Sequence, residues 1–138
     1  MIAKINTDAV LDQMKVLCTT LLEQEAYREL RSSIDRFAAD SDAVKQYERF
    51  LDKHHTLQHK EDNELEWEHD ELEEYMKEEQ ALYDNASIRQ FIHAQRELSN
   101  VHTLVSEYLM KTIELNRLPE PEEHQPKGCG CGGGCGNH

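Results

Sequence analysis

The stretch "SIRQFIHAQRELSNVHTLVSEYLMKTI", residues 87–113, decides the fold of this chain. Its apolar side chains recur at spacings of three and four over about four heptads, as on one face of a coiled-coil helix. The pattern predicts a helix of roughly 30 residues, about 45 Å long, which is longer than the helices expected before it. Part of its apolar face should therefore meet either the middle helices folded back or another subunit, with antiparallel packing and self-association.

The residues before this stretch should be helical nearly throughout. Every glycine and every proline of the chain lies after residue 118. Three shorter apolar patterns precede residue 60 at helical spacing. Their members are Val10, Met14, Leu17 and Leu21, then Tyr27, Leu30, Ile34 and Phe37, then Val44, Tyr47, Phe50, Leu51, His54 and Leu57. We expect an all-α fold of about four to five antiparallel amphipathic helices.

Polar side chains that can accept from free first-turn amides mark the helix starts. Asn6 or Thr7 can cap the start of the first helix, and Asp40 or Ser41 the start of the helix that carries the third apolar pattern. Ser87-x-x-Gln90 is a capping box for the long final helix. A turn is predicted near residues 60–63, where Asn63 and Glu66 form a further cap pair.

The chain divides by composition near "RLPEPEEHQPKG". Pro119 and Pro121 stop a helix, and an acidic, proline-bearing segment favours an extended linker. We expect a helical oligomerisation and interaction domain at 1–118, followed at 119–138 by this linker and a flexible tail rich in glycine and cysteine.

The charge balance restricts the possible partners. The formal net charge is −13, from 28 acidic and 15 basic residues. This argues against unaided binding to nucleic acid, which needs clustered Lys and Arg. The segment between Glu61 and Glu79 is the most acidic; such a run is typical of a solvated face, and its functional alternative is a docking surface for a basic partner.

The lengths of the apolar runs indicate where in the cell the protein is found. No run approaches the roughly 20 apolar residues of a transmembrane helix, and "MIAKINTDAV" lacks the apolar core of a signal peptide. We therefore expect a cytoplasmic protein without membrane insertion. Thiols stay reduced in the cytoplasm, so closely spaced cysteines indicate metal or redox chemistry before disulfides.

The tail "KGCGCGGGCGNH", residues 127–138, is the strongest candidate site. Cys129, Cys131 and Cys135 supply three thiolates, which suit thiophilic metals or an iron–sulfur cluster, and the intervening glycines let the backbone wrap closely. The fourth position is open to His138, a neighbouring subunit, a partner protein or an exogenous ligand. The alternative is a tail that meets metal only adventitiously.

Other possible ligands are scattered. Glu66-x-x-His69 has the spacing of di-iron bundle proteins, but it occurs once and in the most polar segment. His54 and His102 lie on apolar stripes and are interpreted as hydrogen-bonded core or interface residues, and Gln95 as a register-fixing amide. Cys18 lies on the first apolar stripe and is expected in the core. No phosphate loop or hydrolase elbow motif is present in the sequence, so no enzymatic activity is predicted.

The order of these parts resembles the YlbF/YmcA (YheA-like) family of small helical bacterial regulators. The resemblance lies in "DAVLDQMKVLCTTLLE", "EAYRELRSSIDRFAADSDAVKQYERF", the long final helix and "CGCGGGCG". It differs at the turns, where relatives often carry a small capping residue or glycine and this chain has Gln24 and "KEDNE"; this leaves open a longer uninterrupted helix in the acidic middle.

The resemblance implies an oligomeric, non-enzymatic regulator that acts through protein partners. In Bacillus-type bacteria YlbF and YmcA assemble with YaaT, and the complex bears on competence, sporulation, biofilm formation, phosphorelay control and RNA processing by RNase Y. It also implies an iron–sulfur cluster held by tail cysteines, here Cys129, Cys131 and Cys135. We therefore expect a regulatory adaptor, with two alternatives: a metal-handling protein that transfers iron, zinc or copper through the tail, and a di-metal helical-bundle enzyme.

Overall fold

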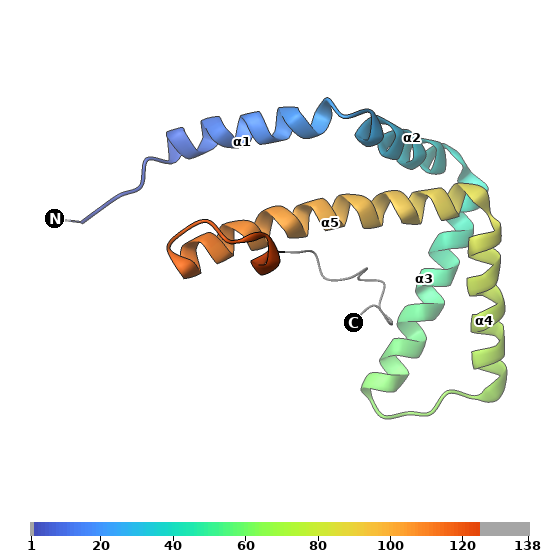
Figure 1. The fold of residues 1–138 in the computed structure, drawn as a ribbon. Coiled ribbons are helices and arrows are strands. Elements are labelled where there is room, and N and C mark those ends of the chain that lie inside the picture. The colour runs from blue at the N-terminus through green and yellow to red at the C-terminus, as the bar shows by residue number, and fades with distance from the viewer. Residues whose placement is uncertain (1, 125–138) are drawn as a thin grey trace. The chain divides into compact units, whose positions relative to one another are not determined.

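The structure is a computed structural model that describes residues 2–124. It contains α1 (Thr7–Leu22), α2 (Glu25–Ala39), α3 (Ser41–Asp62), α4 (His69–Asp84), α5 (Ala86–Leu115) and a short 3-10 turn, η1 (Pro121–Glu123) (Figure 1). These described residues contain no β-strand, which confirms the all-α prediction. The chain forms two compact units, one up to Ala94 and one from Gln95. None of the described helices is both long and apolar enough to span a membrane.

Side-chain caps begin the first and third helices as predicted. Asn6 Oδ1 accepts hydrogen bonds from the backbone N–H groups of Asp8 and Ala9, at 3.1 and 3.2 Å. Asp40 Oδ1 accepts from the N–H of Ala43 at 3.1 Å. Both oxygens satisfy first-turn amides that have no partner inside the helix. The start of α2 differs, because Gln24 stands at its cap position without a side-chain cap bond.

The predicted caps of the last two helices are wrong. Asn85 caps α5 instead of Ser87, since its Oδ1 accepts from the N–H groups of Ser87 and Ile88 at 3.0 and 3.2 Å. At α4, the N–H of Glu68 donates to Glu71 Oε1 at 3.0 Å. In both places a side chain outside the predicted pair reaches the free amides.

The break after α3 is built without glycine. Asn63 ends the helix, and Glu64 has a positive φ of 59°. The N–H of Glu64 donates to Glu61 O at 3.0 Å and that of Leu65 to Lys60 O at 2.7 Å, which is the Schellman pattern of helix termination. The turn predicted near residues 60–63 is confirmed. The alternative of one uninterrupted helix is wrong, because residues 63–68 separate α3 from α4.

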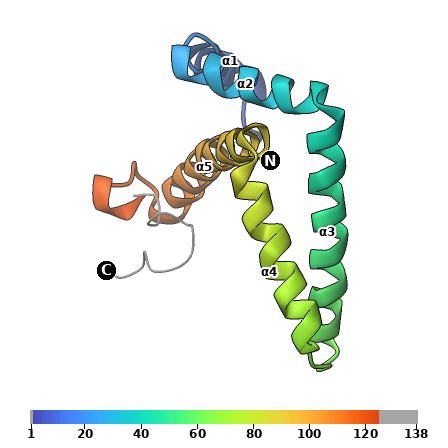
Figure 2. The ribbon, with the colours of Figure 1, turned by 90° about the vertical axis from the view of Figure 1, so that its right-hand side faces the viewer.

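The core of the first unit joins α2, α3, α4 and the beginning of α5. Its buried side chains are Phe37, Ala43, Phe50, Leu82 and Ile88, with Val44, Tyr47, Tyr75, Phe91 and Ile92 packed around them. Phe37 stacks on Phe91 with ring centroids 3.9 Å apart. The chain turns a sharp corner between α2 and α3, and α3 and α4 form an antiparallel hairpin (Figure 2). The stripes predicted on the second and third helices supply Phe37, Val44, Tyr47 and Phe50, and the predicted final helix supplies Ile88, Phe91 and Ile92.

Three expected core residues are exposed. Cys18 lies on α1, which has no buried residue, so its predicted place in the core is wrong. His102 and Gln95 are also exposed in the described chain. A core role for them is wrong, because α5 contributes its buried residues near its start, at Ile88 and Ala94. An interface role for His102 and Gln95 stays a prediction.

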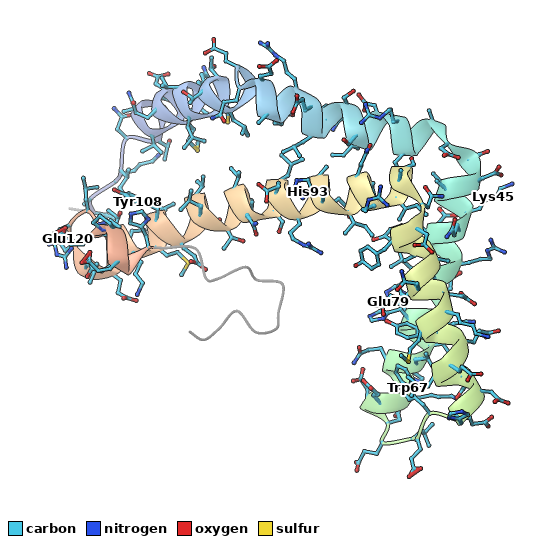
Figure 3. All side chains as sticks on the ribbon, turned by 45° about the vertical axis from the view of Figure 1, so that its right-hand side comes forward. Lys45, Trp67, Glu79, His93, Tyr108 and Glu120 are labelled. Atoms are coloured by element: carbon cyan, nitrogen blue, oxygen red, sulfur yellow. The ribbon has the colours of Figure 1, made fainter. Side chains whose placement is uncertain are left out.

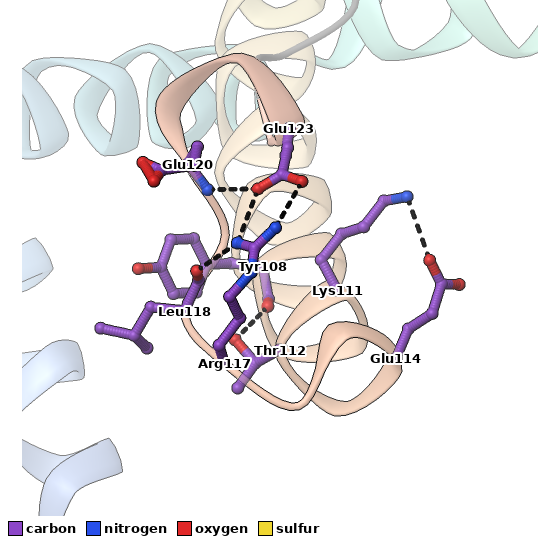
Figure 4. A network of polar contacts seen from close by, with 8 residues as sticks. All are labelled: Tyr108, Lys111, Thr112, Glu114, Arg117, Leu118, Glu120 and Glu123. Atoms are coloured by element: carbon purple, nitrogen blue, oxygen red, sulfur yellow. Dashed lines mark hydrogen bonds and ion pairs between the residues drawn. The ribbon is translucent and has the colours of Figure 1, made fainter.

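The segment after α5 folds back instead of extending. The helix ends at Leu115, before both prolines, and Asn116 follows with a φ of 59°. Pro119 is buried, and the His124 ring meets the Tyr108 ring edge-on with centroids 4.9 Å apart. The extended linker is therefore wrong up to His124, because the His124 ring packs on Tyr108 of α5 and an ion pair between Arg117 and Glu123 closes the segment on itself (Figure 4 shows the ion pair).

Candidate functional site

The first candidate surface is the apolar face of α1. Val10, Met14 and Leu17 lie on one side of the helix because they are three and four residues apart. About half of each of these side chains is exposed, and none of the sixteen residues of α1 is buried. Helices of this length are marginal in water when they stand alone. The face is therefore suited to packing against another protein surface.

A second apolar face occupies the outer part of α5. Val105, Leu109 and Ile113 are spaced by four residues and form this face, and Met110 borders it; all four are exposed, Ile113 by 72%. Glu107 and Lys111 lie on the other side of the same helix. The face itself is apolar, so it can pack against an apolar surface of a partner or of a second copy of the chain.

The α3–α4 hairpin is clamped by two lysines. Lys53 Nζ donates to Glu74, and to Glu78 Oε2 at 2.6 Å. Lys60 Nζ donates to both carboxylate oxygens of Glu71, at 2.7 and 2.6 Å. The bonds to Glu74 and Glu78 raise the pKa of Lys53, and the bond from Lys60 lowers the pKa of Glu71. The two lysines therefore offset part of the negative charge of the three acids on the side of α4 that faces α3.

An aromatic group closes the same hairpin. His54 Nδ1 and Tyr75 Oη are 2.9 Å apart, which makes a hydrogen bond between α3 and α4 and confirms the predicted hydrogen-bonded role of His54. Tyr75 stacks on Phe50 at 5.1 Å and meets Trp67 edge-on at 5.6 Å. Burial, more than the nearby Glu79, raises the pKa of Tyr75. These packed rings hold α4 in a fixed register on α3.

The second unit holds a polar network at the end of α5. The Arg117 guanidinium donates to both carboxylate oxygens of Glu123, at 2.9 and 3.0 Å. The backbone N–H of Glu120 donates to Glu123 Oε1 at 2.6 Å (Figure 4). The hydrogen bonds from Arg117 lower the pKa of Glu123 the most, and the bond from the Glu120 amide adds to this effect; the pKa falls to about 2. We call residues 116–124 the C-terminal hook.

The described residues do not assemble a metal centre. Across residues 2–124, no group of three or more His, Cys, Asp or Glu side chains is placed to hold a metal ion. Glu66 lies in the loop before α4, and the His69 side chain is 86% exposed, 4.0 Å from Glu73. This part of the chain gives no support to the di-metal enzyme alternative.

A family model described as control of competence regulator ComK, YlbF/YmcA, matches residues 10–114. The chain belongs to the YlbF/YmcA family. The match begins inside α1 and ends inside α5, so it covers both exposed apolar faces and the clamped hairpin. No curated protein and no solved structure gives a significant match.

The tail of this YlbF/YmcA-family chain carries the other predicted site. Cys129, Cys131, Cys135 and His138 lie outside the described residues, so their metal or cluster remains a prediction. The family match also stops before them. By donor chemistry alone, three thiolates and an imidazole suit a thiophilic metal or an iron–sulfur cluster.

Sequence reasoning missed two features of this family member. The clamp lysines, Lys53 and Lys60, are seven residues apart on one face of α3, and that spacing opposite an acidic segment was the available signal. The C-terminal hook had a weaker signal. Arg117 and Glu123 are far enough apart that only a chain reversal brings them together, and the prolines between them permit it.

Proposed function

We propose that this chain is a non-enzymatic regulatory adaptor of the cytoplasm, which acts by binding other proteins. The apolar face of α1 carries the proposal, because none of its residues is buried within the described chain. Packing that face against a partner removes Val10, Met14 and Leu17 from water and stabilises a helix that is marginal alone. The family's description as control of a regulator agrees with this role.

One proposed partner is a second copy of the chain. Charges of both signs lie on the sides of these helices away from the apolar faces, Asp12 with Lys15 on α1 and Glu107 with Lys111 on α5. Two copies can therefore meet through these faces without strong repulsion between like charges. We propose a homo-oligomer that buries both faces.

Other proposed partners follow from the family. They are the members of a YlbF/YmcA/YaaT-like complex and RNase Y, which would connect the chain to developmental decisions, the phosphorelay and RNA processing. Direct binding to nucleic acid is not part of the proposal, because the formal net charge of −13 repels phosphates.

Changing Met14→Asp tests the adaptor proposal. A buried charge in the α1 face should reduce the molar mass in sedimentation and remove partners that co-purify from the native cell. Thr19→Asp is the matched control, since Thr19 is exposed on the opposite side of α1. If Met14→Asp keeps both the mass and the partners, the α1 face is not the binding surface and the proposal fails.

We further propose that Cys129, Cys131 and Cys135 hold an iron–sulfur cluster or a thiophilic metal, with His138 or a partner at the fourth position. The support is compositional: three thiols separated by glycines form a compact donor set. Replacing the three cysteines with serine should remove metal from anaerobically purified protein. Cys18→Ser is the matched control and should leave the metal content unchanged. Equal metal in the triple variant would contradict the proposal.

Metal transfer is the second candidate function. It is favoured by the tail's three cysteines, which leave one coordination position for an incoming ligand. An adaptor should yield stable complexes of fixed stoichiometry with its partners. A carrier should instead lose its metal rapidly to an added chelator and to transient partners, which exchange measurements would detect.

A further inference from the structure

Helix α4 has two chemically different sides. The side toward α3 carries Tyr75 and Leu82, together with acids that receive hydrogen bonds from lysines of α3. These acids are Glu71, Glu74 and Glu78. Each of the three acids already pairs with a lysine of α3, and the two lysines offset most of their negative charge.

A second side, about a third of a turn around the helix from the first, has its own apolar stripe. Leu72, Met76 and Tyr83 are spaced by four and seven residues, which places them on one side of the helix. They are 42%, 59% and 43% exposed. A shallow groove of about 400 Å³ runs along this side, lined by His69, Leu72, Glu73, Met76, Lys77 and Gln80. The stripe is not used by the hairpin core.

Acids that form no ion pair with a lysine or arginine of the described residues flank the stripe, although Lys77 lies one turn after Glu73. Glu73 and Glu79 lie three residues before and after Met76, so helical spacing places one on each side of it; Figure 3 labels Glu79 on α4. Asp70 and Asp84 extend this acidic border toward the two ends of α4. Among the described residues, no lysine or arginine pairs with any of these four acids; their recorded contacts are His69 to Glu73 at 4.0 Å and Gln80 to Asp84 at 3.4 Å.

We propose that this outer side of α4 docks a basic amphipathic helix of a partner protein. The partner's apolar residues would cover Leu72, Met76 and Tyr83, and its lysines or arginines would meet Glu73 and Glu79. The sixteen residues of α4 offer about four helical turns of contact. The inference rests on the proposed adaptor function and gives one of its surfaces a partner of defined chemistry.

Charge decides against the other occupants. A second copy of this chain would bring its own acidic border against Glu73 and Glu79, since like charges in contact are unfavourable. An anionic membrane surface would be repelled for the same reason. A neutral or acidic helix could cover the apolar stripe but would leave the border acids unpaired and partly desolvated.

Three synthetic peptides test the inference on the full chain. The first is a 21-residue amphipathic helix of leucine and lysine, the second replaces each lysine with glutamate, and the third keeps the first composition in scrambled order. Fluorescence anisotropy should show binding of the first peptide, weakening as salt increases, and at least about tenfold weaker binding of the other two. Equal binding of all three would overturn the proposal.

Two variants locate the binding. Glu73→Lys with Glu79→Lys removes the acidic border, and Leu72→Ser with Met76→Ser removes the stripe; each should weaken the first peptide about tenfold or more. The control, Glu48→Lys with Asp52→Lys, makes the same charge change at exposed positions of α3 and should have a much smaller effect. Circular dichroism confirms that each variant is folded. If the control variant weakened binding of the first peptide as much as Glu73→Lys with Glu79→Lys does, the proposal would be overturned.

A photoreactive residue at Met76 identifies the natural occupant in the native cell. Capture of a basic amphipathic segment supports the proposal, whereas capture of lipid, of another copy of this chain or of an acidic segment overturns it. The two proposals can fail separately. If the α4 variants keep every partner while Met14→Asp loses them, the adaptor function stands and this docking side is wrong. If Met14→Asp also keeps its mass and partners, the adaptor proposal fails as well.

Discussion

Glu64 occupies a backbone position that normally belongs to glycine. Its φ of 59° lies in the left-handed region, where the Cβ of other residues meets the neighbouring carbonyl. It also places a carboxylate beside the carbonyl end of α3, where the helix dipole is negative. The Schellman bonds of Glu64 and Leu65 hold the strained residue in place.

Replacing Glu64→Gly should therefore raise the free energy of unfolding. We expect a gain of about 1 kcal/mol, less the added entropy of a glycine in the unfolded chain. Chemical denaturation at one fixed protein concentration measures it, because association also affects apparent stability. Asn116→Gly is the control: Asn116 has the same φ, but asparagine tolerates it, so the gain should be smaller. A loss of stability in Glu64→Gly would refute the account of this turn.

At the scale of elements, the α3–α4 hairpin depends on its lysine clamp. Lys53→Gln would leave Glu74 and Glu78 close together without a cation between them. We expect a loss of about 1 kcal/mol at low salt, shrinking as salt screens the pair. Lys45→Gln is the control, since Lys45 is exposed on the same helix and makes no ion pair among the described residues. Equal losses in both variants, measured by denaturation, would show that the clamp is not stabilising.

The C-terminal hook should open in acid. The pKa of Glu123 is lowered from 4.5 to about 2, so its stabilising effect is complete above pH 4.5 and disappears as the pH falls toward 2. The effect should be modest, because Arg117 is half exposed. Amide exchange of the Glu120 N–H and the resonances of the Tyr108 ring report the opening. Glu123→Gln should open the hook already at neutral pH, whereas Glu122→Gln should not; an acid-insensitive hook would contradict the pairing.

At the scale of the whole molecule, body and tail are expected to be separable. A chain ending at His124 keeps both described units and the hook but removes every tail cysteine. We expect its helix content per molecule and its oligomeric mass to match those of the full chain, by circular dichroism and sedimentation, while its bound metal is lost. A change in mass on truncation would mean that the tail helps to assemble the oligomer, contrary to the proposed division of roles.

The helices of this chain were largely predictable, and their ends were less so. Apolar spacing places α2, α3 and α5, because a core face must repeat with the helical period. The predicted caps Ser87 and Asn63 with Glu66 were wrong, because several neighbouring polar residues can reach the same free amides. The local sequence does not choose between these residues. The predicted burial of Cys18 was wrong because periodicity identifies an apolar face but does not show whether the same chain covers it.

The sequence by itself determined the helical class, the acidic character and the separation of a glycine-free body from a thiol tail. These properties depend on composition and short-range spacing, which are local. Only the tertiary structure decided which acids of α4 form ion pairs with lysines of α3 and which face outward. It also decided that the segment after α5 returns to Tyr108. Such pairings join residues distant along the chain, so they exist only once the helices have packed.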